Sequence, residues 1–129
     1  MRNNLFVIVI LCMSLFVGCK YGEKSRIFPE NISADKLQET IKKDPAIVLI
    51  DVREKDELSG PLGKLDGVIN IPMSELEMRY TEIPKNKPVI LICRSGNRSG
   101  KAQVFLKEKG YTLTCNLNGG MKAIRENKQ

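Results

Sequence analysis

A cysteine at position 93 opens a short polar loop that carries two arginines, Arg94 and Arg98. Between the arginines lie Ser95-Gly96-Asn97, and Ser99 follows them. A thiolate is the form of cysteine that attacks electrophiles, and nearby cations and backbone N–H groups stabilise it. These residue types therefore predict a nucleophilic cysteine in a loop that binds small anions, with the residues from Arg94 to Ser99 in contact with the substrate.

The segments on either side of the loop must position this cysteine. Val89–Ile92 is apolar and mostly β-branched, which is typical of a buried parallel strand. After the loop, Ala102, Phe105 and Leu106 recur at the i, i+3, i+4 spacing of an amphipathic helix. Cys93 therefore lies between a strand end and a helix start, where free N–H groups and the helix dipole favour negative charge.

The rest of the chain alternates between strand and helix patterns, which predicts an α/β fold. Further strands are expected at 27–28, 46–50, 68–71 and 111–115. Further helices are expected over about ten residues after Ser33, at 74–82 and at 121–126. We expect a mainly parallel sheet of about five strands, in three layers with helices on both faces, and a ligand site at the carboxyl ends of the strands.

We interpret the other reactive or sulfur-containing side chains mainly as support or core residues. Asp51 and Arg53 leave the end of a predicted strand, and we expect them to support the cysteine loop, with Arg53 pairing to a carboxylate. Cys115 is interpreted as a core residue, with a resolving thiol for Cys93 as the alternative. Met78 is expected to pack in the core, and Met121 either to pack there or to line the site.

Composition excludes several classes of function. The 129 residues suffice for one domain, with 42% hydrophobic and 28% charged residues. The net charge of +6 is spread along the chain, which favours anionic small molecules over nucleic acid. Histidine is absent, which removes the usual general base and the commonest metal ligand. No metal and no cofactor is expected, and the domain is expected to be a monomer.

The N-terminal segment has the pattern of an export signal. Leu5–Val17 is apolar except for one serine, too short to span a bilayer and suited to a signal peptide. It ends in Gly18-Cys19, similar to the cleavage site of bacterial lipoproteins, in which the cysteine is lipidated. We expect a signal peptide at 1–18, a tether at 19–26 and an exported domain held on a membrane by Cys19, the alternatives being an uncleaved anchor or an ordinary signal peptide.

Four segments, in this order and spacing, resemble the rhodanese (sulfurtransferase) family. They are Leu49-Ile50-Asp51-Val52-Arg53, Gly67-Val68-Ile69-Asn70-Ile71-Pro72, Cys93-Arg94-Ser95-Gly96-Asn97-Arg98-Ser99 and Asn118-Gly119-Gly120. The resemblance covers residues 27–127 and implies a rhodanese-like domain. It also implies that Cys93 carries sulfane sulfur as a persulfide, received from a small anionic donor such as thiosulfate and passed to a thiol or cyanide. The chain departs from the family at Lys64 and Ile124, where members often have histidine and tryptophan.

Other functions remain as alternatives at this point. A cysteine phosphatase or an arsenate reductase also places a thiolate and an arginine before a helix, but four residues separate Cys93 from Arg98, a tighter loop than the five of Cys-x5-Arg. A non-catalytic lipoprotein that carries sulfur or docks a partner would use the same residues, so only kinetics separates it from an enzyme. A thioredoxin-like oxidoreductase is excluded because the chain has no Cys-x-x-Cys.

Overall fold

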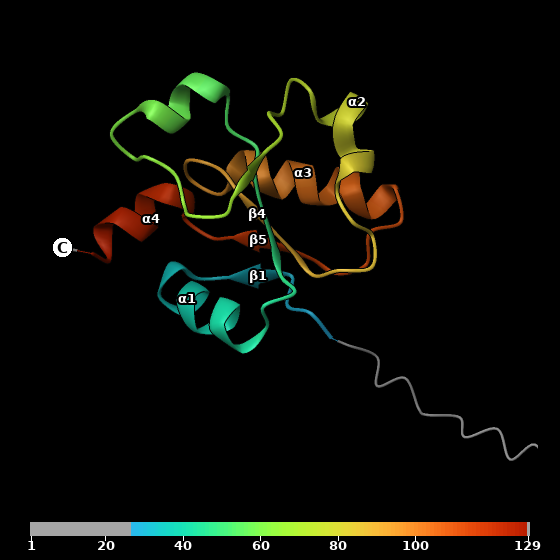
Figure 1. The fold of residues 1–129 in the computed structure, drawn as a ribbon, viewed down its shortest axis with the longest axis horizontal. Coiled ribbons are helices and arrows are strands. Elements are labelled where there is room, and N and C mark those ends of the chain that lie inside the picture. The colour runs from blue at the N-terminus through green and yellow to red at the C-terminus, as the bar shows by residue number, and fades with distance from the viewer. Residues whose placement is uncertain (1–26, 129) are drawn as a thin grey trace, which may run out of the picture.

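A computed structural model of the chain describes residues 27–128, which form a parallel sheet of five strands covered by helices (Figure 1). The strands are β1 (Asn31–Ile32), β2 (Val48–Asp51), β3 (Ile69–Asn70), β4 (Val89–Ile92) and β5 (Thr114–Leu117). The helices are α1 (Ala34–Lys43), α2 (Leu76–Arg79), α3 (Asn97–Glu108) and α4 (Gly120–Glu126), with 3₁₀ turns η1 (Lys55–Ser59) and η2 (Tyr80–Glu82). The predicted α/β fold with a parallel sheet is therefore confirmed.

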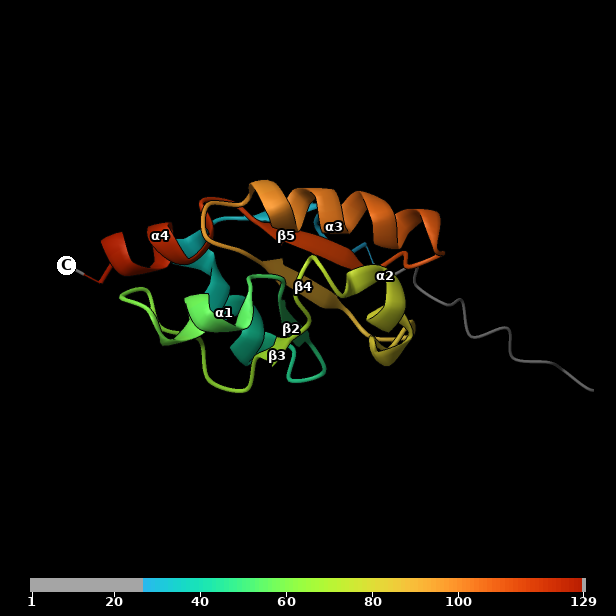
Figure 2. The same cartoon turned by 90° about the horizontal axis from the view of Figure 1, so that it is seen from above.

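The strand order is β1-β5-β4-β2-β3, and Figure 2 shows β5, β4, β2 and β3 in this order. Each side of β4 packs into a different hydrophobic cluster, because successive side chains of a strand point to opposite faces. Val89 and Leu91 join the cluster that includes Leu106 of α3. Ile90 and Ile92 join the cluster that includes residues of α1 and α4. The sheet is thus covered on both faces, as a buried apolar strand requires.

The first strand, at the edge of the sheet, differs from the prediction. The first strand is Asn31–Ile32 and not residues 27–28, and Ile27 is 93% exposed. Pairing with β5 decides this position, since the N–H of Asn116 donates to the carbonyl of Glu30 and the strands align from Asn31 onwards. A two-residue strand depends on its partner more than on its own residues, so its pattern alone misplaces it.

The last strand and the short helix also differ in detail. The predicted strand at 111–115 is displaced to Thr114–Leu117, because Tyr111 packs in the core and its hydroxyl donates to the carbonyl of Ile83. The prediction of Met78 as a core residue was wrong, since its side chain is 78% exposed. The helix that contains Met78, α2, is only one turn long and buries a single residue, Leu76.

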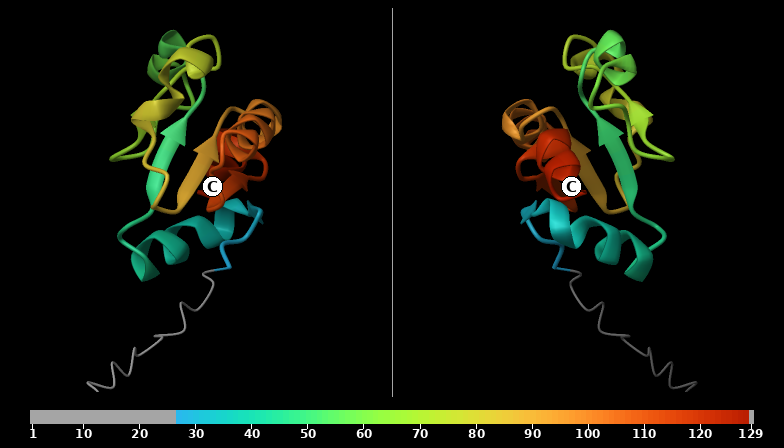
Figure 3. Two further views of the ribbon diagram at one scale, coloured as in Figure 1. Left: turned by 90° about the vertical axis from the view of Figure 1, so that its right-hand side faces the viewer. Right: turned by 90° about the vertical axis from the view of Figure 1, so that its left-hand side faces the viewer.

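The topology opens a site at the carboxyl ends of the two central strands. β2 and β4 are neighbours and point in the same direction (Figure 3). The chain continues from β2 to β3 on one side of the sheet and from β4 to β5 on the other, so the segments that leave the two strands diverge. Ligands of open parallel sheets bind at such a point. Within residues 27–128, no helix is both long and apolar enough to cross a membrane.

Candidate active site

Cys93 follows β4 directly and lies at the bottom of the loop that leads into α3. Its exposed fraction is 1%, so the thiol is reached only by small reagents. The sulfur atom accepts hydrogen bonds from the N–H of Gly96 at 3.1 Å and from the hydroxyl of Ser99 at 3.3 Å. Two donors directed at one sulfur are the arrangement that favours a thiolate.

Hydrogen bonds outweigh burial in setting the acidity of this thiol. Burial alone would raise the pKa of Cys93, because a charge is less stable in a low-dielectric site. The hydroxyl and the N–H of Ser99, together with the N–H groups of Ser95 and Gly96, lower the pKa of Cys93 below its usual value. These contacts, more than the two guanidinium groups expected to act with them, stabilise the thiolate.

The start of α4 holds the loop in place. The carbonyls of Cys93 and Arg94 accept hydrogen bonds from the N–H groups of Met121 at 2.9 Å and Lys122 at 3.0 Å. A trans peptide directs its C=O and its N–H to opposite sides, so the N–H groups that follow these carbonyls point away from α4, towards the loop. Gly120 makes this contact possible, because a Cβ there would lie 2.3 Å from the Cys93 carbonyl oxygen.

Arg98 is held by a carboxylate that the sequence analysis did not identify. Its Nη1 and Nη2 donate to the Oε2 and Oε1 of Glu57 at 2.6 and 2.7 Å. Glu57 comes from η1 after β2, where it forms a capping box with Glu54. The paired guanidinium lowers the pKa of Glu57 to about 2, so the pair is ionised at neutral pH. Arg98 therefore links α3 to η1 across the site.

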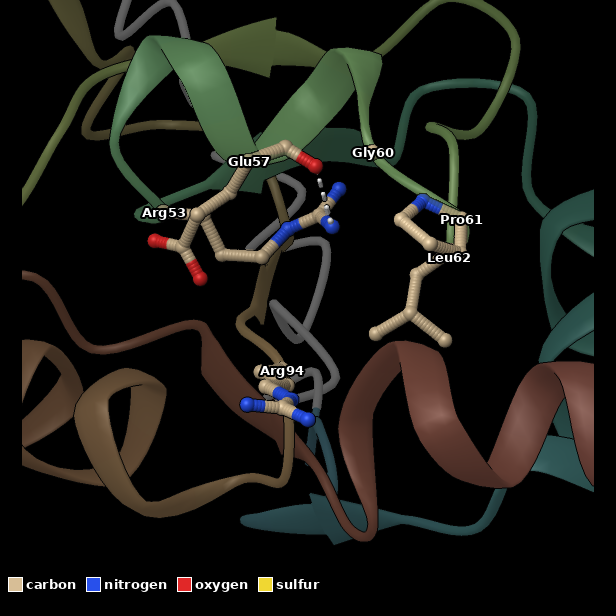
Figure 4. Close-up of a pocket in the computed structure, with 6 residues that line it drawn as sticks. All are labelled: Arg53, Glu57, Gly60, Pro61, Leu62 and Arg94. Atoms are coloured by element: carbon tan, nitrogen blue, oxygen red, sulfur yellow. Dashed lines mark hydrogen bonds between the residues drawn. The ribbon is translucent and has the colours of Figure 1, made fainter.

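Arg94 lies beside a pocket of about 350 Å³. In Figure 4 it lies across the pocket from Arg53 and Glu57, with Pro61 and Leu62 on a third side. Among the described residues, the Arg94 guanidinium has no hydrogen-bond or ion-pair partner. It is therefore the arginine of this loop that is available to an anionic ligand.

Asp51 and Arg53 form a buried ion pair at the end of β2. The Arg53 guanidinium, 1% exposed, donates to both Asp51 carboxylate oxygens at 2.7 to 3.0 Å and to the Gly63 carbonyl at 2.7 Å. A planar guanidinium makes such bidentate contacts readily. The carboxylate partner of Arg53 is as predicted. The pair ties the end of β2 to the loop at Gly63, however, and not to the cysteine loop that it was expected to support.

Asn116 of β5 was also absent from the predicted site residues. Its Oδ1 lies 2.6 Å from the Ser99 hydroxyl oxygen, and its Nδ2 donates to the Gly96 carbonyl at 3.2 Å. A buried amide side chain inside a strand is a signal for such a role, but the strand is expected from the sequence to end at Cys115, one residue earlier. Asn116 thus connects β5 to two residues that contact the Cys93 sulfur.

The second cysteine of the described chain lies on the other face of the sheet. Cys115 packs in the cluster formed with α1 and α4, whereas Cys93 belongs to the cluster under α3. Burial raises the pKa of Cys115 to about 12, so it remains a thiol at neutral pH. This placement supports the core interpretation and gives Cys115 no route to the Cys93 sulfur.

The remaining predicted residues have separate placements. Ser95 and Asn97 are exposed at the loop surface, and Met121 is buried beneath the loop. Cys19, predicted as the lipidation site, lies outside the described residues. Among residues 27–128 no group of three or more His, Cys, Asp or Glu side chains could hold a metal ion.

The chain is similar to known proteins along most of its length. The model of the rhodanese-like domain matches residues 33–127. A protein of Allochromatium vinosum named Sulfurtransferase is 33% identical over 92 residues, which are 71% of this chain and 84% of that protein. The Bacillus subtilis protein named Uncharacterized protein YqhL is 34% identical over 122 residues, covering 95% of this chain and 92% of that protein.

A solved structure agrees with this sequence match. The crystal structure of a rhodanese-related protein from Thermoplasma volcanium superimposes with a TM-score of 0.68 at 35% identity, covering 77% of this chain and 93% of that one. The family match at residues 33–127 includes the Cys93 loop. The chain therefore belongs to the rhodanese-like family.

Proposed function

We propose that the chain is a sulfurtransferase that moves sulfane sulfur from thiosulfate to a thiophilic acceptor through a persulfide on Cys93. The observation that carries this proposal is the pair of hydrogen bonds, from Gly96 and Ser99, that the Cys93 sulfur accepts at the start of α3. Membership of a family with a sulfurtransferase-named relative supports the same reaction class.

In the first half-reaction the Cys93 thiolate attacks the outer sulfur of thiosulfate. A new S–S bond forms to Cys93, the S–S bond of thiosulfate breaks, and sulfite leaves with the electron pair of that bond. The negative charge of the thiolate moves to the outer sulfur of the persulfide. N–H groups at the loop and at the N-terminus of α3 stabilise negative charge on either sulfur.

In the second half-reaction the acceptor takes the outer sulfur. Cyanide or a thiolate attacks this sulfur, the persulfide S–S bond breaks, and Cys93 leaves as a thiolate. Thiocyanate or the persulfide of the acceptor departs, and the site is ready for another donor. Each half-reaction breaks one S–S bond and forms one new bond to the transferred sulfur, S–S with a thiol and C–S with cyanide, with no added electron, and the scheme predicts ping-pong kinetics.

Arg94 is the residue that we assign to binding of the anionic donor. It is unpaired among the described residues and lies on the pocket, whereas Arg98 is already bound to Glu57. A guanidinium offers several donors in one plane, which suits the oxygen atoms of a sulfonate group such as that of thiosulfate. The donor would thus bind with its oxygens at Arg94 and its outer sulfur towards Cys93.

We also propose that lipidation of Cys19 holds this domain at a membrane on the exported side. The apolar segment Leu5–Val17 and the small residue before Cys19 support this. Replacing Cys19 with serine should move the chain from the membrane fraction to the soluble fraction, while Cys12→Ala should not. Retention of the Cys19 variant in the membrane fraction would instead indicate an uncleaved anchor.

Steady-state kinetics with thiosulfate and cyanide tests the enzymatic proposal. The wild-type chain should produce thiocyanate, and Cys93→Ser should produce none. Arg94→Leu should raise the KM for thiosulfate about tenfold, the equivalent of one exposed charge-assisted contact. Lys36→Leu is the matched control, because it removes one exposed cation from α1 and should leave KM unchanged.

Two outcomes would argue against an enzyme that uses Cys93 as its nucleophile. If thiosulfate adds sulfur to Cys93 but no acceptor removes it at a useful rate, the chain is a sulfur carrier and not an enzyme. If Cys93→Ser retains the wild-type rate of thiocyanate formation, the assignment of the nucleophile is wrong.

A further inference from the structure

Asn116 has an orientation that its two neighbours determine. The Gly96 carbonyl can only accept a hydrogen bond, so the side-chain nitrogen of Asn116, 3.2 Å away, must face it. The side-chain oxygen then faces the hydroxyl of Ser99 at 2.6 Å. Because an amide oxygen only accepts, any hydrogen bond in this short contact is donated by the Ser99 hydroxyl.

The Ser99 hydroxyl has one proton and two acceptors. Besides the Asn116 oxygen, the Cys93 sulfur lies 3.3 Å from Ser99 Oγ. When the proton is directed at Asn116, Ser99 presents only lone pairs to the sulfur, which suits a thiol that can donate to it. When Cys93 is a thiolate, the proton must turn to the sulfur. The Asn116 oxygen then loses a donor in a residue that is only 8% exposed, and this has a free-energy cost.

We propose that Asn116 is a positioning residue that competes with Cys93 for the proton of Ser99 and thereby sets how readily the cysteine ionises. This inference rests on the proposed role of Cys93 as the nucleophile. It also links the two half-reactions. In the persulfide the charge has moved from the Cys93 sulfur to the outer sulfur, so the Ser99 proton can return to Asn116.

Charged groups near Cys93 come from several neighbouring elements, and the replacement of Asn116 alters the chemistry of none of them. They are Arg98 of α3, Glu54 and Glu57 beside and within η1, the Asp51–Arg53 pair at the end of β2, and Arg94 in the loop itself. Cys115, from β5, faces the opposite side of the sheet. A shift in the ionisation of Cys93 on replacing a neutral amide would therefore report the competition for the Ser99 proton.

The test is the pH dependence of Cys93 alkylation by iodoacetamide in the full chain, read by peptide mass spectrometry to separate Cys93 from the other cysteines. Asn116→Leu keeps the branched shape of the side chain but has no acceptor, so the midpoint should move to lower pH by about 0.5 to 1 unit. Ser99→Ala should move it to higher pH by about 1 to 2 units, because the donor to the thiolate is lost.

The double variant separates competition from a general structural effect. If Asn116 acts through Ser99, Ser99→Ala with Asn116→Leu should have the same midpoint as Ser99→Ala alone. Asn116→Ala provides a second variant should the leucine not fit, and its midpoint should also move to lower pH. An unchanged or raised midpoint in a folded Asn116 variant, or a further shift in the double variant, would overturn the inference.

Alkylation requires no sulfur donor, so the result does not depend on turnover. If thiosulfate is not a substrate but the midpoints shift in the expected opposite directions, the competition is correct and the proposed function fails. If the wild type turns over thiosulfate while the Asn116 variants show no downward shift, the competition alone fails.

Discussion

Gly120 is the position at which a single methyl group should disturb the candidate site most directly. A Cβ at this residue would lie 2.3 Å from the carbonyl oxygen of Cys93 and 2.7 Å from the carbonyl carbon and oxygen of Arg94. All three atoms belong to the backbone, so no side-chain rotation relieves the overlap. Gly120→Ala should therefore push the cysteine loop and the start of α4 apart, by about 1 Å if normal contact distances are restored.

Gly67 provides a matched control for this substitution. Both glycines have positive φ, 55° at Gly120 and 70° at Gly67, so alanine costs about 1 to 2 kcal/mol of backbone strain at either position. No atom lies within 4 Å of a Cβ built at Gly67. The overlap at Gly120 should add about 1 to 3 kcal/mol, a typical cost for overpacking. The difference between the two variants isolates the contact with the loop.

Thermal unfolding and the rate of sulfur transfer together measure the effect. Gly120→Ala should unfold below Gly67→Ala by about 4 to 8 °C for each additional kcal/mol. Its rate of sulfur transfer should fall about 100-fold, since a displacement of about 1 Å at a reacting atom has this order of effect. Equal losses of stability and of rate in the two variants would refute the claim that Gly120 positions the loop.

Three further predictions concern the ion pairs and the second cysteine. The pKa of Glu57 is lowered to about 2 in the folded chain, so the stability that Glu57 contributes is present above its unfolded pKa of 4.5 and is lost as the pH falls towards 2. Unfolding measured across this acid range should show the loss, and Glu57→Gln should abolish this pH dependence. If Glu57→Gln leaves the acid profile unchanged, the contact with Arg98 does not contribute. Arg53→Met should destabilise the chain by about 3 to 5 kcal/mol in denaturant unfolding, because Asp51 is left buried without its partner. The double variant Asp51→Leu with Arg53→Met should recover much of this loss. If it recovers none, the unpaired carboxylate of Asp51 is not the cause of the destabilisation. Cys115→Ala should lower the free energy of unfolding by about 1 to 2 kcal/mol and leave the rate of persulfide formation on Cys93 unchanged. A loss of that rate would favour the alternative in which Cys115 is a resolving thiol.

The central part of the fold could be predicted because its signals are local. Val89–Ile92 is a continuous apolar run, and residues 93–99 follow it without interruption, so strand, loop and helix start could be placed from the sequence. The loop residues that contact the sulfur, Gly96 and Ser99, lie within that same stretch. A site built from one contiguous segment is visible in the sequence.

The parts that were missed depend on contacts between distant segments. Glu57 reaches Arg98 from the segment after β2, and Asn116 reaches Ser99 from β5, and neither contact has a local pattern. The displaced first strand shows the same limit, since its position is set by hydrogen bonds to β5. Met78 was misassigned because a one-turn helix buries too few residues for helical spacing to decide which they are.

Peptide mass spectrometry of the full chain after brief exposure to thiosulfate decides whether Cys93 carries the transferred sulfur. We expect one added sulfur atom on the peptide that contains Cys93, and we expect cyanide to remove it with formation of thiocyanate. The Cys93→Ser variant should gain no sulfur under the same conditions. Sulfur found on Cys115 in place of Cys93, or no added sulfur at all on a folded chain, would rule out a Cys93 persulfide as the intermediate.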